Sequence, residues 1–121
     1  MQRAFVNAKI HRARVTHADL DYMGSITIDT TLLEAADILP NEKVLVINLE
    51  NGSRLETYAI EGKRDSGVIG MNGGCARHCQ VGDRVIIMTF VDLTKGEAKD
   101  HKPKLVFVDE KNAITSLAGD A

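Results

Sequence analysis

The chain has 121 residues, 44% of them hydrophobic, and a formal net charge of −2. This length suits one domain with one modest core. The balanced charge lacks the basic excess of nucleic-acid-binding proteins, and no apolar run approaches the length of a membrane span, so we expect neither kind of partner. The first residues lack the apolar run of a signal peptide, and two cysteines do not make a secreted disulfide framework, so we expect a cytoplasmic protein.

Aromatic residues make up only 4% of the chain, so we expect a core of valine, isoleucine, leucine and alanine. The first predicted element is a long strand at residues 4–17. Lys9 and His11 share one face of this strand because side chains alternate from side to side. The lysine cation and the imidazole can therefore point into the same cleft.

A short strand at 26–28 and a helix at 31–38 are predicted next. Thr31 and Glu34 have the spacing of a capping box, which favours a helix start at Thr31. Pro40 stands two residues beyond the last predicted helical residue and ends the helix. We expect this small helix to cover one mouth of a barrel.

The middle of the chain predicts a β-hairpin. Strands at 43–49 and 53–61 flank Asn51-Gly52, the strongest hairpin turn in the sequence. Alternation along the second strand places Arg54 and Tyr58 on one face, and Thr57 on the other.

The last third of the chain predicts three more strands and a loop that can bind a ligand. A strand at 68–71 leads into Asn72-Gly73-Gly74-Cys75, a loop whose backbone amides can be presented to a ligand. Strands at 84–91 and 105–108 follow, separated by a charged turn or short helix, and the tail from about Asp109 is expected to be loose. Six or seven short strands with one or two small helices indicate a mainly β protein, a small barrel with helical covers.

The stretch Tyr22-Met23-Gly24-Ser25 offers two interpretations. A Gly-Ser pair is usually a turn. The chemical alternative is that the Ser25 hydroxyl attacks the Gly24 carbonyl in a strained backbone and converts the peptide bond into an ester. Elimination and hydrolysis then split the chain and leave Ser25 as an N-terminal pyruvoyl group. The dipeptide alone favours the turn.

Two other kinds of site are considered and set aside. Cys75, His78 and Cys79 are three potential soft ligands, but a structural zinc site usually needs four, so we expect no metal. Ser25 could join Asp19 and His11 in a hydrolase triad, but the sequence lacks the G-x-S-x-G motif of a nucleophile elbow.

Five stretches of the sequence form a recognisable set. They are K-I-H-R at 9–12, T-H-A-D-L-D-Y-M-G-S at 16–25, N-G-S-R-L-E-T-Y-A-I at 51–60, I-G-M-N-G at 69–73 and V-G-D at 81–83. Taken together, they resemble the pyruvoyl-dependent aspartate alpha-decarboxylase family, and the resemblance spans about residues 1–108 without a gap. It implies a six-stranded double-psi β-barrel with short covering helices, a single domain over 1–121, and a homotetramer with sites at the subunit interfaces.

The resemblance implies a lyase made as a zymogen, whose autocatalytic cleavage between Gly24 and Ser25 yields a β chain (1–24) and an α chain (25–121). The covalent pyruvoyl group, rather than pyridoxal phosphate, would form a Schiff base with L-aspartate. The products would be β-alanine and carbon dioxide, and β-alanine would feed pantothenate and coenzyme A biosynthesis.

Residue roles are also implied by position. Tyr58 would be the proton donor beside Ser25. Thr57 would contact substrate and, with Tyr22 and Gly24, assist the cleavage. The substrate pocket would be lined by Gly73, Gly74, Cys75, Lys9, His11, Arg54 and Asn72. Binding a carboxylate equally strongly in the ground state and in the transition state does not speed the reaction. We therefore expect Arg54 to bind, through two hydrogen bonds, the carboxylate that the product retains, with Lys9 adding a point charge.

This sequence departs from the family in the loop that usually reads N-G-A-A-A-H. Gly74 and Cys75 replace two alanines, and the histidine stands one place later, at His78, with Arg77 before it. Two alternatives stay open: a pyruvoyl decarboxylase for another acidic amino acid such as glutamate, and a non-catalytic double-psi barrel that serves as a binding module. The sequence also leaves open whether a maturation factor drives the cleavage.

Overall fold

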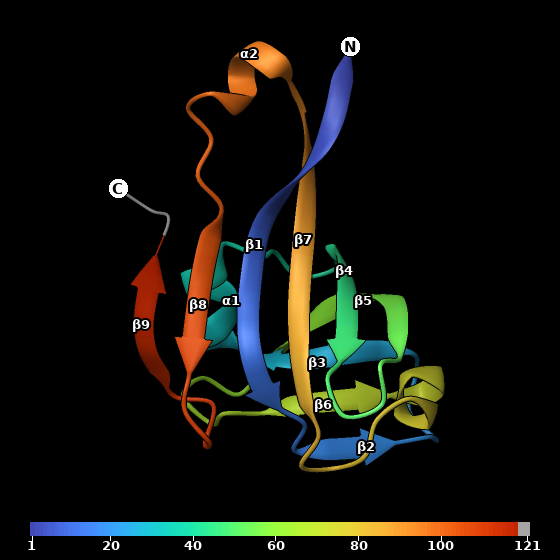
Figure 1. Ribbon diagram of the computed structural model, residues 1–121. Coiled ribbons are helices and arrows are strands. Elements are labelled where there is room, and N and C mark those ends of the chain that lie inside the picture. The colour runs from blue at the N-terminus through green and yellow to red at the C-terminus, as the bar shows by residue number, and fades with distance from the viewer. Residues whose placement is uncertain (119–121) are drawn as a thin grey trace.

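The computed structural model describes residues 1–118 and consists mainly of β-strands (Figure 1). The mainly β class expected from the sequence is confirmed. The elements in chain order are β1 (Gln2–Arg14), β2 (His17–Asp19), β3 (Ser25–Asp29), α1 (Thr30–Ala36), β4 (Lys43–Asn48), β5 (Arg54–Gly62), β6 (Ile69–Asn72), the 3-10 helix η1 (Gly73–Arg77), β7 (Arg84–Thr94), α2 (Lys95–Ala98), β8 (Lys104–Val108) and β9 (Ile114–Ala118).

The strands of the described chain form one sheet in the order β2-β6-β3-β5-β4-β7-β1-β8-β9. Each half has a central strand with one antiparallel and one parallel neighbour. In one half β3 lies between β6 and β5, and in the other β1 lies between β7 and β8. Nine strands exceed the six or seven expected, and their order does not close, so the double-psi barrel remains a prediction.

Strands β1 and β7 form a long antiparallel ribbon that extends beyond the rest of the sheet and carries α2 at its end (Figure 1). Two irregularities interrupt the pairing, one after Val6 and one between Ile10 and Ala13. Arg12 lies in the second and has a φ of 65°, a left-handed conformation that is uncommon for an arginine. A bulge of this kind bends its strand and increases the local twist.

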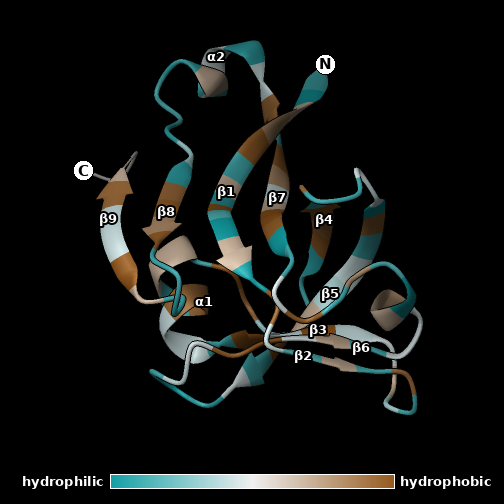
Figure 2. Cartoon of the chain, turned by 60° about the horizontal axis from the view of Figure 1, so that its bottom comes forward, coloured by the Kyte–Doolittle hydropathy of each residue, from teal (hydrophilic) through white to brown (hydrophobic). Residues whose placement is uncertain are grey.

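The core is aliphatic, as the composition predicts. Hydrophobic and hydrophilic residues alternate along the strands in Figure 2, because one face of each strand is buried. No aromatic residue belongs to the buried core of the described residues. The largest fully buried side chains include Ile10, Ile26, Ile28, Leu32, Ile69, Met71 and Ile87. None of the described helices is long and apolar enough to cross a membrane.

Helix α1 begins one residue earlier than predicted. Its N-cap is Asp29, whose carboxylate accepts a hydrogen bond from the Thr31 amide at 2.8 Å, so the expected capping box at Thr31 is wrong. This buried carboxylate also accepts the amides of Asp65 and Gly67, which fixes the turn beside the helix. A capping box does occur at α2, where Thr94 and Glu97 cap each other.

The C-terminal segment is ordered, contrary to the expectation of a loose tail from Asp109. Strand β9 pairs with β8, and Asn112 is only 2% exposed. The Asn112 side chain accepts from the Arg14 amide at 2.7 Å and donates to the carbonyls of Arg14 and Gly67 at 2.8 and 2.7 Å. The final three residues of the predicted tail lie outside the described part.

Candidate active site

Ser25 is the best-defined candidate for chemistry. It begins β3, is 1% exposed and lies opposite Asn72 of β6 in the antiparallel register. The Asn72 side-chain amide donates to Ser25 Oγ and to Thr27 Oγ1, both at 2.9 Å. The preceding residues Tyr22 and Met23 are 53% and 77% exposed. A fixed, buried hydroxyl therefore follows directly after an exposed segment.

Gly73 presses against the backbone that precedes Ser25. Its φ is +60°, and a Cβ added there would lie 2.8 Å from the Tyr22 carbonyl oxygen and 2.9 Å from the Gly24 Cα. Only glycine fits both the backbone conformation and the space. A Cβ on Gly24 itself would meet nothing within 4 Å. The Gly24-Ser25 bond thus has close backbone on one side and open space beside Gly24.

The predicted loop 72–75 is instead the end of β6 followed by η1. Gly74 is exposed, and a Cβ there would meet nothing within 4 Å. The Cys75 side chain is buried at 8% exposure and carries a free thiol. An alanine therefore fits at Gly74, whereas any residue at Cys75 must pack into the core.

Tyr58 belongs to the strand that flanks Ser25 on the other side. The parallel pairing of β3 with β5 begins at Ile26 and Ala59, so Ser25 and Tyr58 each lie one residue before this pair. Alternation places the Tyr58 side chain on the Ser25 face of the sheet, and Tyr58 is 36% exposed. Thr57 faces the opposite way. Arg54, four residues before Tyr58, is exposed on the Tyr58 face.

Lys9 and His11 lie in the other half of the sheet. Three strands, β5, β4 and β7, separate their strand β1 from β3. His11 packs edge-on against Phe107 with ring centroids 5.6 Å apart. Partial burial lowers the pKa of His11, and the positive charges of Lys9 and Arg12 lower it further. The strand order of one chain therefore puts these two residues in a different part of the sheet from Ser25.

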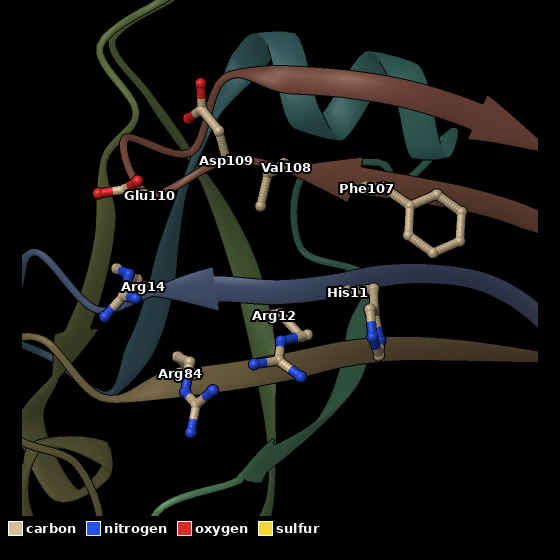
Figure 3. A pocket seen from close by; sticks show the side chains of 8 residues that line it. All are labelled: His11, Arg12, Arg14, Arg84, Phe107, Val108, Asp109 and Glu110. Atoms are coloured by element: carbon tan, nitrogen blue, oxygen red, sulfur yellow. The ribbon is translucent and has the colours of Figure 1, made fainter.

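A cavity of about 400 Å³ adjoins His11 (Figure 3). The three arginines come from β1 and β7, and the two carboxylates come from the segment after β8. The cavity is lined by His11, Arg12, Arg14, Arg84, Phe107, Val108, Asp109 and Glu110. It belongs to the Lys9 and His11 half of the sheet and contains none of the predicted residues around Ser25.

An apolar surface lies between the two groups of predicted site residues. It consists of Leu45, Ile47, Ile86 and Met88, which are half-buried and occupy one face of β4 and β7. The strand registers place Lys9 beside Met88 at one border of this surface, and Arg54 beside Ile47 at the other.

His78 fastens the end of η1 to the β4–β5 hairpin. The side chains of Asn48 and Asn51 each donate to the His78 carbonyl at 3.0 Å, and Ser53 Oγ lies 2.8 Å from the His78 Nδ1. Burial raises the pKa of the nearby Cys79 thiol.

No group of three or more His, Cys, Asp or Glu side chains that could hold a metal ion occurs among the described residues.

The hydrolase triad does not assemble in the described chain. Ser25 Oγ is hydrogen-bonded to Asn72, Asp19 accepts a hydrogen bond from the Asp21 amide at 3.0 Å, and His11 lies against Phe107.

Thr27 is the residue near Ser25 that sequence reasoning missed. Its two-residue spacing from Ser25 places it on the same strand face, which is the signal that could have found it.

The family model described as aspartate decarboxylase matches residues 1–115. A protein of Thermoanaerobacter pseudethanolicus named Aspartate 1-decarboxylase is 60% identical over 117 residues, which cover 97% of this chain and 100% of that protein. A protein of the same name from Carboxydothermus hydrogenoformans is 57% identical over 112 residues, covering 93% of this chain and 88% of that protein. The computationally designed protein msDPBB_sym2 is 16% identical with a TM-score of 0.44 over 72% of this chain and 99% of that one, a likeness too weak to support an argument.

Proposed function

This chain belongs to the aspartate decarboxylase family, and on that premise we propose that it converts L-aspartate to β-alanine and carbon dioxide with a pyruvoyl group made from Ser25. The observation that carries the proposal is the buried Ser25 hydroxyl, held by Asn72 directly after the open Gly24. The β-alanine would enter pantothenate and coenzyme A biosynthesis. Two free, buried thiols suit the reducing cytoplasm as its location.

The proposed maturation is a self-cleavage of the Gly24-Ser25 bond. Ser25 Oγ attacks the Gly24 carbonyl carbon, and the Ser25 nitrogen leaves as an amine, so that the peptide becomes an ester. Loss of the Ser25 Cα proton then breaks the Cβ–Oγ bond and releases the Gly24 carboxylate. The resulting enamine becomes an imine, which takes up one water and loses one ammonia to give the pyruvoyl group. The products are chains of residues 1–24 and 25–121.

The surroundings of Ser25 fit such a group. The missing side chain of Gly73 leaves space that the Tyr22–Gly24 backbone occupies. Asn72 provides a hydrogen-bond donor to the Ser25 side chain. A donor fixed in advance stabilises charge that develops on an oxygen. Once formed, the pyruvoyl group supplies the electron sink for the pair of electrons left when carbon dioxide departs.

Side chains of this chain would bind and protonate the substrate. Arg54 can hold a carboxylate through two parallel hydrogen bonds, and Lys9 adds positive charge. Tyr58 lies on the Ser25 face and would donate its phenolic proton to the carbon that has lost carbon dioxide. Thr57, Gly73, Gly74, Cys75 and His11 would complete the pocket.

The separation of Lys9 from Ser25 supports a site shared between copies of the chain. We propose a homotetramer in which the surface of Leu45, Ile47, Ile86 and Met88 is covered by a second copy. This surface is bordered by Lys9 at one edge and by Arg54 at the other, so its burial would bring a Lys9 of one copy towards the Ser25 half of another.

The test is the intact mass of the purified protein under denaturing conditions, followed by product analysis. We expect two chains, with pyruvoyl replacing serine at the start of the second, and β-alanine as the product from aspartate. Ser25→Ala is expected to stay whole and inactive, and Tyr58→Phe to be cleaved but slow in turnover. A chain that stays uncut after prolonged warming would overturn the proposed self-cleavage. Faster turnover of glutamate than of aspartate would contradict the proposal that aspartate is the substrate.

A further inference from the structure

We propose that Thr27 is a positioning residue for the cleavage after Gly24 and acts through the side chain of Asn72. The inference rests on the proposed self-cleavage. One primary amide links the two hydroxyls, since Asn72 Nδ2 lies 2.9 Å from Ser25 Oγ and 2.9 Å from Thr27 Oγ1. An amide nitrogen has two hydrogens, so it can donate one to each. The bond to Thr27 thereby fixes which way the other hydrogen points.

Thr27 is itself held by close packing between two neighbouring strands. A Cβ on Gly62 of β5 would lie 3.0 Å from the Thr27 Cγ2, and a Cβ on Gly70 of β6 would lie 3.4 Å from the Thr27 Cβ. The β-branched side chain has few rotamers open to it, and this packing restricts them further. Gly62 thus leaves space that the threonine side chain occupies, and Gly70 lies at ordinary contact distance on its other side.

This arrangement bears on the step that splits the chain. When the Cβ–Oγ bond breaks, Oγ leaves as an oxygen of the Gly24 carboxylate, and an N–H that already points at this oxygen stabilises the charge it gains. Asn72 is only 7% exposed, so without the Thr27 hydroxyl one of its N–H groups would be left without an acceptor. The amide would then turn towards another partner, and Ser25 Oγ would lose its aligned donor.

The experiment follows the cleavage of freshly made precursor by intact mass over time. Thr27→Val keeps the shape of the side chain and removes the hydroxyl, and we expect cleavage about tenfold slower in a precursor that still unfolds cooperatively. Thr27→Ser restores the hydroxyl and should recover most of the rate, which a purely structural role would not require. Thr27→Ala gives the same comparison with a smaller side chain should the valine variant not fold.

Thr89→Val is the matched control. Thr89 is also a strand threonine, is 1% exposed, and its Oγ1 has no hydrogen-bond partner within the described structure. Its replacement removes a buried hydroxyl far from Asn72 in the strand order, so the cleavage rate should stay at the wild-type value. Equal slowing in Thr27→Val and Thr89→Val would overturn the inference.

A double-mutant cycle tests whether Thr27 acts through Asn72. Asn72→Ala should slow cleavage at least as much as Thr27→Val, and the double variant should be no slower than Asn72→Ala. Slowing by the product of the two single effects would overturn the inference, as would a Thr27→Val rate equal to that of the wild type. An uncut wild-type protein would instead overturn the proposed function, so the two failures are distinguishable.

Discussion

Gly73 touches Gly24: a Cβ added to Gly73 would lie 2.9 Å from both the Cα and the nitrogen of Gly24. Gly73→Ala must therefore displace the residues before the cleavage point, and it also forces alanine into a left-handed backbone. We expect slower cleavage and a loss of about 1–2 kcal/mol in the free energy of unfolding. Intact mass and urea denaturation of the uncut precursor measure the two effects.

The neighbouring Gly74→Ala is the control for Gly73→Ala. A Cβ at Gly74 meets nothing within 4 Å, and the backbone there is not left-handed. Alanine should leave the cleavage rate unchanged and stabilise the fold by about 0.4–1 kcal/mol, because it restricts the unfolded chain. Slower cleavage in Gly74→Ala would show that the loop needs its backbone freedom rather than the space at Gly73.

The pKa of His11 should rise when a neighbouring positive charge is removed. Partial burial and the charges of Lys9 and Arg12 lower it from 6.5, so Arg12→Gln should bring it back towards that value. The unfolded chain binds a proton on His11 at a higher pH than the folded chain does. His11 thus stabilises the fold above about pH 6.5, and this contribution is lost as the pH falls through the lowered pKa.

An NMR titration of the His11 ring in both proteins measures this shift. Arg3→Gln serves as the control, because Arg3 is exposed near the start of β1 and does not contribute to the shift at His11. A His11 pKa that is the same in wild type and Arg12→Gln would contradict the prediction.

Asn112→Ala should destabilise the protein by about 2–3 kcal/mol. The substitution leaves the Arg14 amide and the carbonyls of Arg14 and Gly67 without their side-chain partner, and it strains a backbone whose φ is 62°. Asn112→Gly loses the same hydrogen bonds without this strain and should fall between wild type and Asn112→Ala. Urea denaturation of the three proteins gives their free energies of unfolding. If Asn112→Gly is as stable as wild type, the three hydrogen bonds contribute nothing to stability.

Mixed subunits test whether the site is shared between copies. Co-expression of Lys9→Ala with Arg54→Ala should restore about a quarter of the wild-type activity, because random pairing gives some sites both intact residues. Co-expression of Arg54→Ala with Tyr58→Phe should restore no activity. Both residues lie on β5, so each site takes both from the same copy, and every copy in this mixture lacks one of them. Absence of recovery in the first mixture would place all three residues in a site within one chain.

Local patterns predicted much of this fold. The Asn51-Gly52 turn, the alternation along β5 and the apolar run of β7 each depend on neighbours in sequence, and the hairpin and both strands are present. The N-cap of α1 was placed wrongly because Asp29 is stabilised by amides 36 and 38 residues away, which no local pattern reveals. Strand β9 escaped prediction because four of its five residues are exposed and give no apolar alternation.

The predicted residues around Ser25 were accessible to sequence reasoning for different reasons. Asn72 and Gly73 were found through their position in the resemblance, and the structure places both against the Tyr22–Ser25 stretch. Thr27 was missed because a threonine in a strand is common. Its two-residue spacing from Ser25 indicates only a shared strand face, and the contact with Asn72 then identifies its role. The distance of Lys9 from Ser25 depends on the strand order, which the sequence does not specify.

The proposed cut also changes what the mature protein is. Residues 1–24 carry β1, which pairs with both β7 and β8, and their covalent link to the rest of the chain is the bond that breaks. The mature molecule would then be a two-chain assembly held by backbone pairing and burial alone. Its unfolding would release a separate peptide, so its apparent stability should rise with protein concentration, whereas that of uncut Ser25→Ala should not change through this dissociation.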